Sequence, residues 1–349
     1  MDPLLNVSSA PEPRLDVADL HVRFWLRGSL PGVGRRSVDA VSGVSLQVEP
    51  GETVGLVGES GSGKTSLARA ILRLQPTSGG TIRFAGSDIT RLRGRDLRAL
   101  RRRMQFILQD PYASLDPRMT VKSILAEPLA IHRLASGEAR RARILELLSL
   151  VGLGPQYFHR YPHEMSGGQR QRIGIAQALA VNPDFVVCDE PVASLDVSAQ
   201  AQVLNLLMDL RDRLGLTMLF IAHDLGIVRR ISSRVLVMYL GTIVEAGPTD
   251  AVFSKPCHPY TRALLSAAFE PNPAVARARK RIVLRGDPPS AEHRPAGCPF
   301  HSRCWLYEQL GSPEMCRTDK PVPTRIEDKH FSACHFVSKL DAVEVGRAS

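Results

Sequence analysis

Apolar residues in the first 250 positions follow two spacings, one typical of strands and one typical of helices. Short apolar runs predict buried strands at residues 53–57, 104–108, 185–190 and 217–222, and an alternating pattern predicts a strand at 15–24. Apolar residues three and four apart predict helices at 66–74, at 121–153 with a helix start at Ser136, and at 198–214. Strands that alternate with helices in this way indicate an α/β fold.

The stretch between the strand at 53–57 and its following helix has the pattern G-x-x-x-x-G-K-[ST] of a phosphate-binding loop. Glycines let the backbone turn tightly and approach an anion, and free N–H groups at the helix start point at phosphate. Lys64 supplies a positive charge for the β- and γ-phosphates, and the Thr65 hydroxyl is placed to hold Mg²⁺. The residues predicted to bind the nucleotide are Gly58, Glu59, Ser60, Gly61, Ser62, Gly63, Lys64, Thr65 and Ser66.

Polar side chains stand at the ends of three other predicted strands. Asp189 and Glu190 follow one apolar run, and Gln109 and His223 each end another. Ligands bind at the carboxyl ends of strands in open α/β sheets, so these side chains are candidates for one site. We expect Asp189 and Gln109 to hold Mg²⁺, and Glu190 to take a proton from water that attacks the γ-phosphate. His223 would face the same phosphate, although a lone histidine or glutamine is more often structural.

A second candidate anion site lies at Ser166-Gly167-Gly168-Gln169, which opens a helix predicted to run to about Ala180. The Ser166 hydroxyl and the free N–H groups of this helix start could bind a phosphate. An ordinary serine-capped helix would have the same sequence. The residues alone leave both interpretations open.

Chain length, composition and net charge limit the classes of protein to which this sequence can belong. The chain has 349 residues, 44% of them hydrophobic, and a formal net charge of +10. No apolar run is long enough for a membrane span, and we see no signal peptide. Seven arginines between residues 91 and 103 form the densest basic patch, which fits either a solvated helix face or a phosphate contact. The patch has no interleaved aromatic residues to stack bases, which disfavours nucleic acid.

The order of these motifs resembles the nucleotide-binding subunit of ABC transporters over roughly residues 15–250. The resemblance implies a P-loop NTPase fold with a RecA-like core, an antiparallel β-subdomain and a helical subdomain. It also implies a head-to-tail dimer, in which each ATP contacts the loop of one subunit and, in the other, Ser166, Gly167, Gly168 and Gln169. Asp196 would lie at the dimer seam. Phe24, or alternatively Trp25, would stack on adenine.

Three further segments resemble the ATPases of oligopeptide and dipeptide importers, whose relatives carry nickel or glutathione. They are Gln109–Pro117, Asp196–Ser198 and His258–Thr261. This resemblance implies an ATP-hydrolysing importer subunit on the cytoplasmic face of the inner membrane. Its partners would be two membrane-spanning permeases, a second and usually paralogous ATPase, and an external peptide-binding protein, with no nucleic acid. The alternative weighed against it is a soluble ABC-type ATPase that acts on DNA or ribosomes.

The same comparison of segments divides the chain into four parts. Residues 1–14 form a loose tail, 15–256 the ATPase domain, 257–336 a C-terminal domain with clustered cysteines, and 337–349 a second tail.

Four of the six cysteines crowd into the last quarter of the chain: Cys298, Cys304, Cys316 and Cys334. Their spacing matches neither zinc ribbons nor ferredoxin runs, so spacing does not choose between an iron–sulfur cluster, zinc and free or disulfide-bonded thiols. The resemblance to peptide importers implies a [4Fe–4S] cluster, with Zn²⁺ as the alternative. His301 and His335 lie near the cysteines in sequence and could replace a thiol ligand, although both are more often expected as surface residues.

Overall fold

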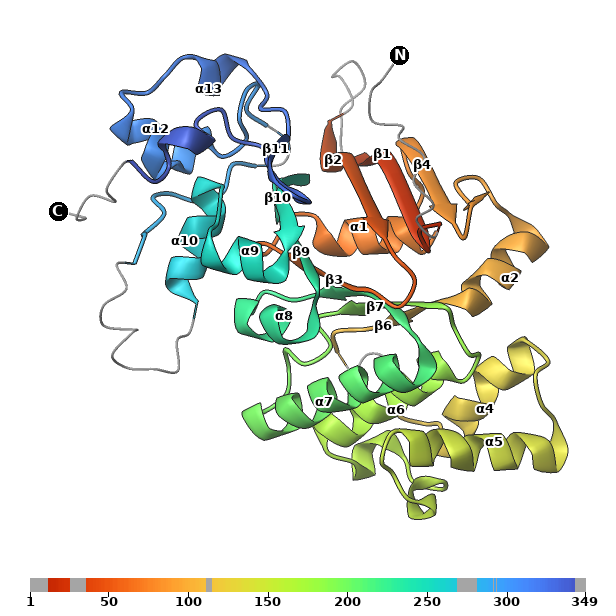
Figure 1. Ribbon diagram of the computed structural model, residues 1–349. Coiled ribbons are helices and arrows are strands. Elements are labelled where there is room, and N and C mark those ends of the chain that lie inside the picture. The colour runs from red at the N-terminus through yellow and green to blue at the C-terminus, as the bar shows by residue number, and fades with distance from the viewer. Residues whose placement is uncertain are drawn as a thin grey trace.

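The computed structural model describes residues 12–25, 36–110, 115–268, 281–290, 292 and 294–342. Residues 111–114, inside the importer-like segment after Gln109, lie outside the described residues, as do 1–11 and 343–349 of the predicted tails. The described chain forms two β-sheets, a group of helices at one end and a C-terminal region at the side (Figure 1).

Five parallel strands form the centre of the larger sheet, in the order β9-β3-β8-β7-β6. Their bounds are β3 Thr53–Val57, β6 Met104–Ile107, β7 Phe185–Asp189, β8 Thr217–Ile221 and β9 Arg234–Tyr239. Strands β3, β7 and β8 are buried at every position, which explains their unbroken apolar runs. Because the strands are parallel, the carboxyl ends of β3, β6, β7 and β8 meet at one edge.

The smaller sheet is antiparallel, with strand order β2-β1-β4-β5. Its strands are β1 Leu15–Trp25, β2 Ser37–Val48, β4 Gly79–Phe84 and β5 Ser87–Asp88. The first four positions of β2 are half-buried and show no alternation, so apolar spacing does not mark where this strand begins. Helix α1 (Lys64–Ile71) contacts β1 and β2 on one side and β7 on the other.

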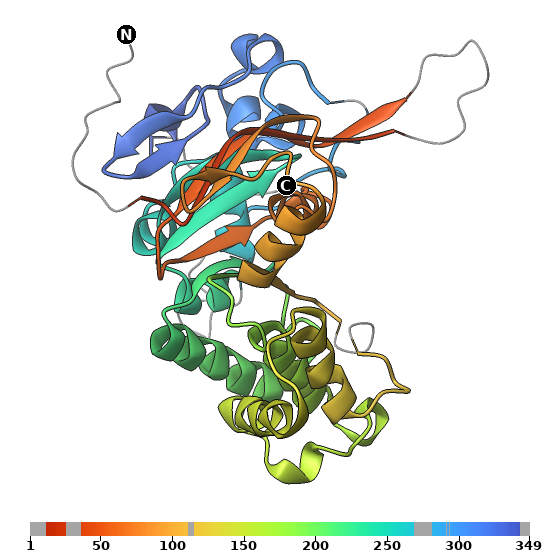
Figure 2. The same cartoon turned by 90° about the vertical axis from the view of Figure 1, so that its right-hand side faces the viewer.

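The four longest of the described helices lie at the end of the molecule opposite the smaller sheet (Figure 2). They are α4 Val121–Ile131, α5 Gly137–Leu150, α6 Gly167–Leu179 and α7 Val197–Leu214, while α2 Gly94–Arg103 and α8 Leu225–Ile231 flank the sheet. Ser136 is the N-cap residue of α5, as predicted. Helix α6 packs against α4, α5 and α7 and so holds this group together.

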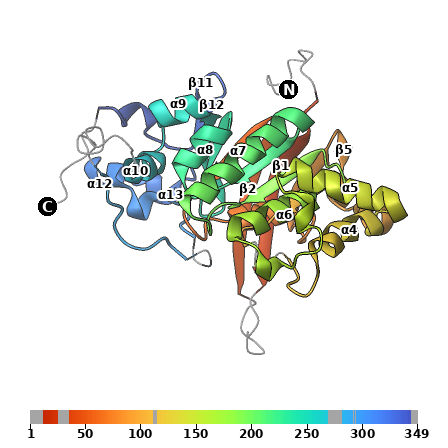
Figure 3. The ribbon, with the colours of Figure 1, turned by 90° about the horizontal axis from the view of Figure 1, so that it is seen from below.

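The C-terminal region begins beyond β10 (Thr242–Pro248), the strand that pairs antiparallel with β9. Its elements are α9 Thr249–Ser254, α10 Pro259–Ala267, α12 Trp305–Gln309, α13 Met315–Thr318, β11 Thr324–Glu327 and β12 His330–Ser332. Strand β12 pairs with β10 and β11 pairs with β12, so the region extends the large sheet. Viewed from below, α10, α12 and α13 lie on the side opposite α4–α6 (Figure 3).

The C-terminal region also shares the hydrophobic core of the large sheet. Tyr239 of β9, Tyr260 of α10 and Phe300 pack ring against ring, with centroids 4.7 to 5.3 Å apart. All three side chains are buried, at no more than 1% exposure. The division at residue 256 therefore crosses a continuous sheet and core. Within the described ranges, no helix has the length and apolar character needed to cross a membrane.

Candidate functional site

The phosphate-binding loop lies between β3 and α1, where the sequence predicts it. The Lys64 ammonium donates to the carbonyl oxygens of Gly58 at 2.7 Å and Glu59 at 2.8 Å, and it lies 3.4 Å from the Ser62 hydroxyl. Burial lowers the pKa of Lys64, while the carboxylates of Glu190 and Asp189 oppose that change. A buried ammonium inside a ring of backbone groups is well placed to bind a phosphate oxygen.

Two of the loop glycines are required by neighbouring backbone. A Cβ atom at Gly58 would lie 2.2 Å from the carbonyl oxygen of Met238, and one at Gly63 would lie 2.2 Å from that of Ala40. Gly63 also has φ 104°, a conformation that favours glycine. From the sequence, glycines are expected in this loop because they let the backbone approach an anion. The structure adds a second reason, which is close packing against β9 and β2.

Thr65 and Asp189 meet beside the loop, at the ends of α1 and β7. The Thr65 hydroxyl donates to a carboxylate oxygen of Asp189 at 3.3 Å. Asp189 is 5% exposed, and this burial raises the pKa of its carboxyl group. A hydroxyl and a carboxylate in contact are oxygen ligands of the kind that Mg²⁺ takes from this fold.

Glu190 is the centre of the second cluster at this edge. Its Oε2 lies 3.2 Å from Nε2 of Gln109, which donates to it, and 3.1 Å from Nδ1 of His223. Glu190 has φ 46°, a left-handed conformation that is costly for a residue with a Cβ atom. Such strain is found where a side chain must be aimed for function. Three strand ends thus bring a carboxylate, an amide and an imidazole together, as the sequence predicts.

The second candidate anion site does not meet the phosphate loop within the single chain. Ser166 caps α6, accepting from the Gln169 N–H at 3.3 Å, and the Gln169 side chain accepts from the Ser166 N–H at 3.0 Å. Asp196 caps α7 in the same way through the Ala199 N–H at 2.9 Å.

The starts of α6 and α7 lie side by side because α6 begins with two glycines. A Cβ atom at Gly167 would meet Leu195 at 3.2 Å, and one at Gly168 would meet Ala199 at 3.1 Å. The two helix starts therefore lie against each other and bring the capping residues Ser166 and Asp196 to the same part of the molecule.

The remaining predicted nucleotide residues are less constrained. Phe24 and Trp25 end β1, with 42% and 60% of their surfaces exposed. Either ring is accessible to a flat ligand. The carbonyl of Ser66 accepts a hydrogen bond from Gln75, and its hydroxyl has no contact that assigns it a role.

Two residues of the C-terminal region hold the phosphate loop in place, and neither contact was predicted from the sequence. The Glu59 N–H donates to the hydroxyl of Tyr260 at 2.8 Å. The Glu59 carboxylate forms an ion pair with Arg303 at 2.8 Å, and the Arg303 side chain is only 8% exposed. Arg303 also donates to the carbonyl of Gly286 at 3.1 Å. Partners about two hundred positions away give no local signal, although Tyr260 lies in a motif noted for another reason.

The four clustered cysteines are all free thiols and line one small pocket of about 20 Å³. Burial raises the pKa of Cys298 and Cys304 to about 12 and that of Cys334 to about 11, and nearby thiols add to each effect. No three of the four sulfur atoms lie within 4.8 Å of one another. His301 and His335 border the pocket, but each ring has a nitrogen bonded to a backbone carbonyl.

Two family models match the chain. Residues 41–193 match the ABC transporter family, and residues 244–309 match the family described as the oligopeptide/dipeptide transporter, C-terminal region. The two matches together include the phosphate loop, Glu190 and two of the four clustered cysteines.

Similar proteins cover nearly the whole chain. A putative oligopeptide transport ATP-binding protein of Bacillus subtilis is 46% identical over 95% of this chain and 98% of its own length. A probable peptide ABC transporter ATP-binding protein of Sinorhizobium fredii is 48% identical over 92% of this chain and 88% of its own length. A putative peptide import ATP-binding protein of Brucella ovis is 50% identical over 92% of this chain and 97% of its own length.

Solved structures support the same fold. A dimeric ATP-binding cassette in a post-hydrolysis state, bound to ADP and phosphate, superposes with a TM-score of 0.60 at 27% identity, over 67% of this chain and 98% of its own. A component of a transporter complex from Clostridium perfringens has a TM-score of 0.59 at 25% identity, over 70% of this chain and 91% of its own. The fold expected from sequence, that of an ABC ATPase cassette, is confirmed.

Proposed function

Because this chain belongs to the ATP-binding proteins of ABC transporters that carry the oligopeptide/dipeptide C-terminal region, we propose that it is the ATP-hydrolysing subunit of a peptide importer. The observation that carries the proposal is the meeting of Gln109, Glu190 and His223 at one sheet edge, beside Thr65 and Asp189. A candidate base, candidate Mg²⁺ ligands and a candidate group to hold the γ-phosphate are present there.

The roles of these residues follow from their positions. Lys64 and the N–H groups of the loop bind the phosphates, and Thr65, Asp189 and Gln109 are the proposed ligands of Mg²⁺. Glu190 orients the attacking water and accepts its proton, while His223 holds the water and the γ-phosphate in position. Gln109 bonds to Glu190, so the same amide can link the metal to the base.

The surface formed by the α6 and α7 starts fits the second half of an ATP site. In the proposed dimer, the N–H groups and hydroxyl at Ser166, with Gly167, Gly168 and Gln169, bind the γ-phosphate held by the loop of the other subunit. Asp196 lies at the seam between the subunits. The other subunit is proposed to be a paralogue, which would make the pair a heterodimer.

Peripheral attachment to a membrane follows from the proposed role. Two permease subunits would span the membrane, and an external peptide-binding protein would deliver substrate to them. The chain would bind to the permeases from the cytoplasmic face. Residues 15–256 are proposed to act as the ATPase domain and residues 257–336 as its C-terminal domain.

Cys298, Cys304, Cys316 and Cys334 are the proposed ligands of a [4Fe–4S] cluster. Four thiolates on one zinc ion would lie about 3.8 Å apart, given Zn–S bonds of about 2.3 Å. No three of the four sulfur atoms lie within 4.8 Å of one another, and a cluster in which each thiolate binds a different iron accepts a wider spacing than a single zinc ion. Anaerobic purification tests the assignment, because iron-free protein with a folded C-terminal region would reject it.

Other cargoes and other partners are less well supported. Nickel and glutathione are the alternative cargoes, because cargo is selected by the permeases and the binding protein. The relatives described above do not support a soluble ATPase that acts on nucleic acid, because their names are those of transport proteins. Tagged protein that recovers membrane-spanning subunits supports import, and recovery of nucleic acid instead would contradict it.

The catalytic role of Glu190 is tested by Glu190→Gln. The substitution keeps the side chain's size and a hydrogen-bonding group but removes the base, so we expect ATP binding to persist while single-turnover hydrolysis falls by a factor of about 10² or more. The matched control is Glu308→Gln, which alters a carboxylate that is 56% exposed. Near-normal hydrolysis by Glu190→Gln would remove Glu190 from the role.

A further inference from the structure

Three buried side chains with metal-binding atoms converge where the C-terminal region joins the large sheet. They are Glu245 on β10, Cys257 between α9 and α10, and His330 at the start of β12. Glu245 and His330 are each 1% exposed, and Cys257 is 4% exposed. None of them belongs to the ATP site or to the group of four cysteines.

The ligand atoms of the three residues all lie within 4.8 Å of one another. His330 Nε2 lies 2.8 Å from Glu245 Oε1, which also accepts the Cys257 N–H at 2.6 Å. Bonds of about 2.0–2.3 Å from a tetrahedral zinc ion place its ligands about 3.3–3.8 Å apart. The three atoms therefore need only small side-chain movements to bind one ion.

The backbone around the three residues makes room for this arrangement. A Cβ atom at Gly247 would lie 2.8 Å from the ring of His330, so glycine is what allows the imidazole to lie over β10. The hydroxyl of Ser332 donates to the carbonyl of Cys257 at 2.7 Å, which ties the cysteine to β12.

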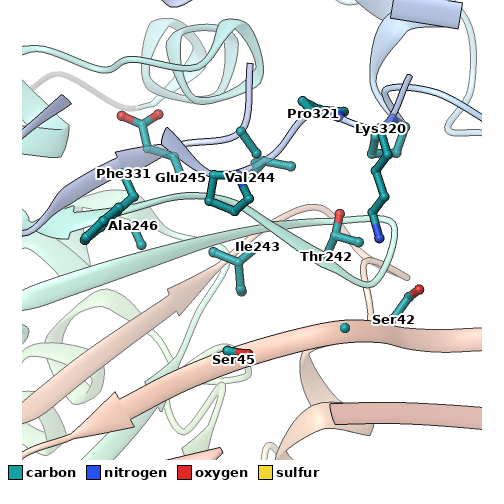
Figure 4. A pocket seen from close by; sticks show the side chains of 14 residues that line it. Ser42, Ser45, Thr242, Ile243, Val244, Glu245, Ala246, Lys320, Pro321 and Phe331 are labelled. Carbon is teal, nitrogen blue, oxygen red and sulfur yellow. The ribbon is translucent and has the colours of Figure 1, made fainter. Parts of the chain in front are cut away.

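The site is separate from the largest nearby cavity. A cavity of about 550 Å³ lies between β2, β10 and the segment at Lys320, and residues 242–246 of β10, including Glu245, line part of it. The Glu245 carboxylate points away from Ile243 and Ser45, which face each other across that cavity (Figure 4). The carboxylate instead turns toward His330 and Cys257 on the other side of the strand.

One feature of this cluster is costly unless a cation is present. The second carboxylate oxygen of Glu245, Oε2, is buried and has no hydrogen-bond partner among the described residues. The Cys257 thiol is also buried, and it donates a hydrogen bond to the carbonyl of Lys255 at 3.2 Å. A divalent ion supplies a partner for the carboxylate oxygen and replaces the thiol proton.

We propose that Glu245, Cys257 and His330 bind one Zn²⁺ ion, with a water molecule as the fourth ligand. A carboxylate, a thiolate and a neutral imidazole carry two negative charges in total, which a divalent ion balances inside the protein. The mixed set of sulfur, nitrogen and oxygen donors suits zinc better than Mg²⁺ or Ca²⁺, which take oxygen ligands. The ion would fasten the C-terminal region to the sheet edge.

Metal analysis of the full chain, purified anaerobically without added chelator, tests the proposal. We expect one zinc per chain in addition to any iron, and loss of that zinc in both Cys257→Ser and Glu245→Gln, with iron unchanged. Cys188→Ala, which removes a buried thiol from β7, is the matched control and keeps its zinc. A zinc-free wild-type chain, or zinc retained by both variants, would overturn the proposal and leave a buried Glu–His pair.

Cobalt provides a second measurement if a variant folds poorly. Replacing zinc with Co²⁺ in the wild-type chain should give visible bands of a tetrahedral site together with near-ultraviolet thiolate-to-cobalt absorption. Cys257→Ser should lose the thiolate absorption relative to the wild-type chain, and Cys188→Ala should keep it. Identical cobalt spectra for the wild-type chain and Cys257→Ser would exclude Cys257 as a ligand.

Discussion

Replacing Arg303 with methionine tests whether the C-terminal region controls the ATP site. Arg303 forms a 2.8 Å ion pair with Glu59, the second residue of the phosphate loop, and the two side chains are 8% and 27% exposed. Methionine keeps much of the apolar volume and removes the charge. The substitution therefore releases the loop from one of its two contacts with this region, while the bond from Glu59 to Tyr260 remains.

The expected effect can be worked out from the contact. A hydrogen bond to a charged group contributes about 1.5–3 kcal/mol when it is well buried. Partial exposure of Glu59 reduces this value, and Lys64 and Tyr260 continue to hold the loop. We therefore expect the substitution to weaken the binding of ATP by about 1 kcal/mol. That free energy corresponds to an increase of about fivefold in the dissociation constant for ATP.

Equilibrium binding of Mg–ATP to Arg303→Met, Glu59→Gln and the double variant measures this coupling. We expect the double variant to bind about as weakly as Arg303→Met alone, because both changes break the same contact. Lys255→Met is the control, since it breaks an ion pair of the same region whose side chains are 58% and 55% exposed. Unchanged affinity in Arg303→Met, or additive losses in the double variant, would refute the coupling.

Two further substitutions test local geometry. Gly63→Ala should abolish ATP binding, because its Cβ would lie 2.2 Å from the Ala40 carbonyl, whereas Gly61→Ala, with no atom within 4 Å, should cost about 1 kcal/mol of backbone strain and keep measurable binding in the same titration. Asp196→Ala should lower the free energy of unfolding by about 1 kcal/mol through loss of the α7 cap, and Asp196→Asn should preserve it, as measured by denaturant unfolding. Equal stabilities for the two Asp196 variants would contradict the capping role.

Short-range patterns predicted the core of the cassette well. The buried strands β3 and β7 were located within a residue, because strands covered on both faces are continuous apolar runs. The loop between β3 and α1 and the polar residues at strand ends followed from the same elements. Parallel strand order then placed Gln109, Glu190 and His223 together, as expected from their positions at strand ends.

Contacts between distant segments were not predictable in this way. The Tyr260 and Arg303 contacts with Glu59 depend on the packing of the C-terminal region against the loop, and no spacing in the sequence encodes it. The convergence of Glu245 and His330 depends on the pairing of β10 with β12. Strand β12 is three residues long, too short for its alternation to be distinguished from a turn.

The contacts of the C-terminal region argue that it belongs to the mechanism as well as to the fold. It pairs with the sheet edge through β12, packs its rings on Tyr239 of β9, and bonds to the phosphate loop at Glu59. Arg303 immediately precedes Cys304 in the chain, so a change at the cysteine pocket alters the backbone that positions the guanidinium. Loss of the proposed cluster from this pocket would therefore change the position of Arg303 and its contact with Glu59, so the four thiols could influence ATP affinity without touching the nucleotide.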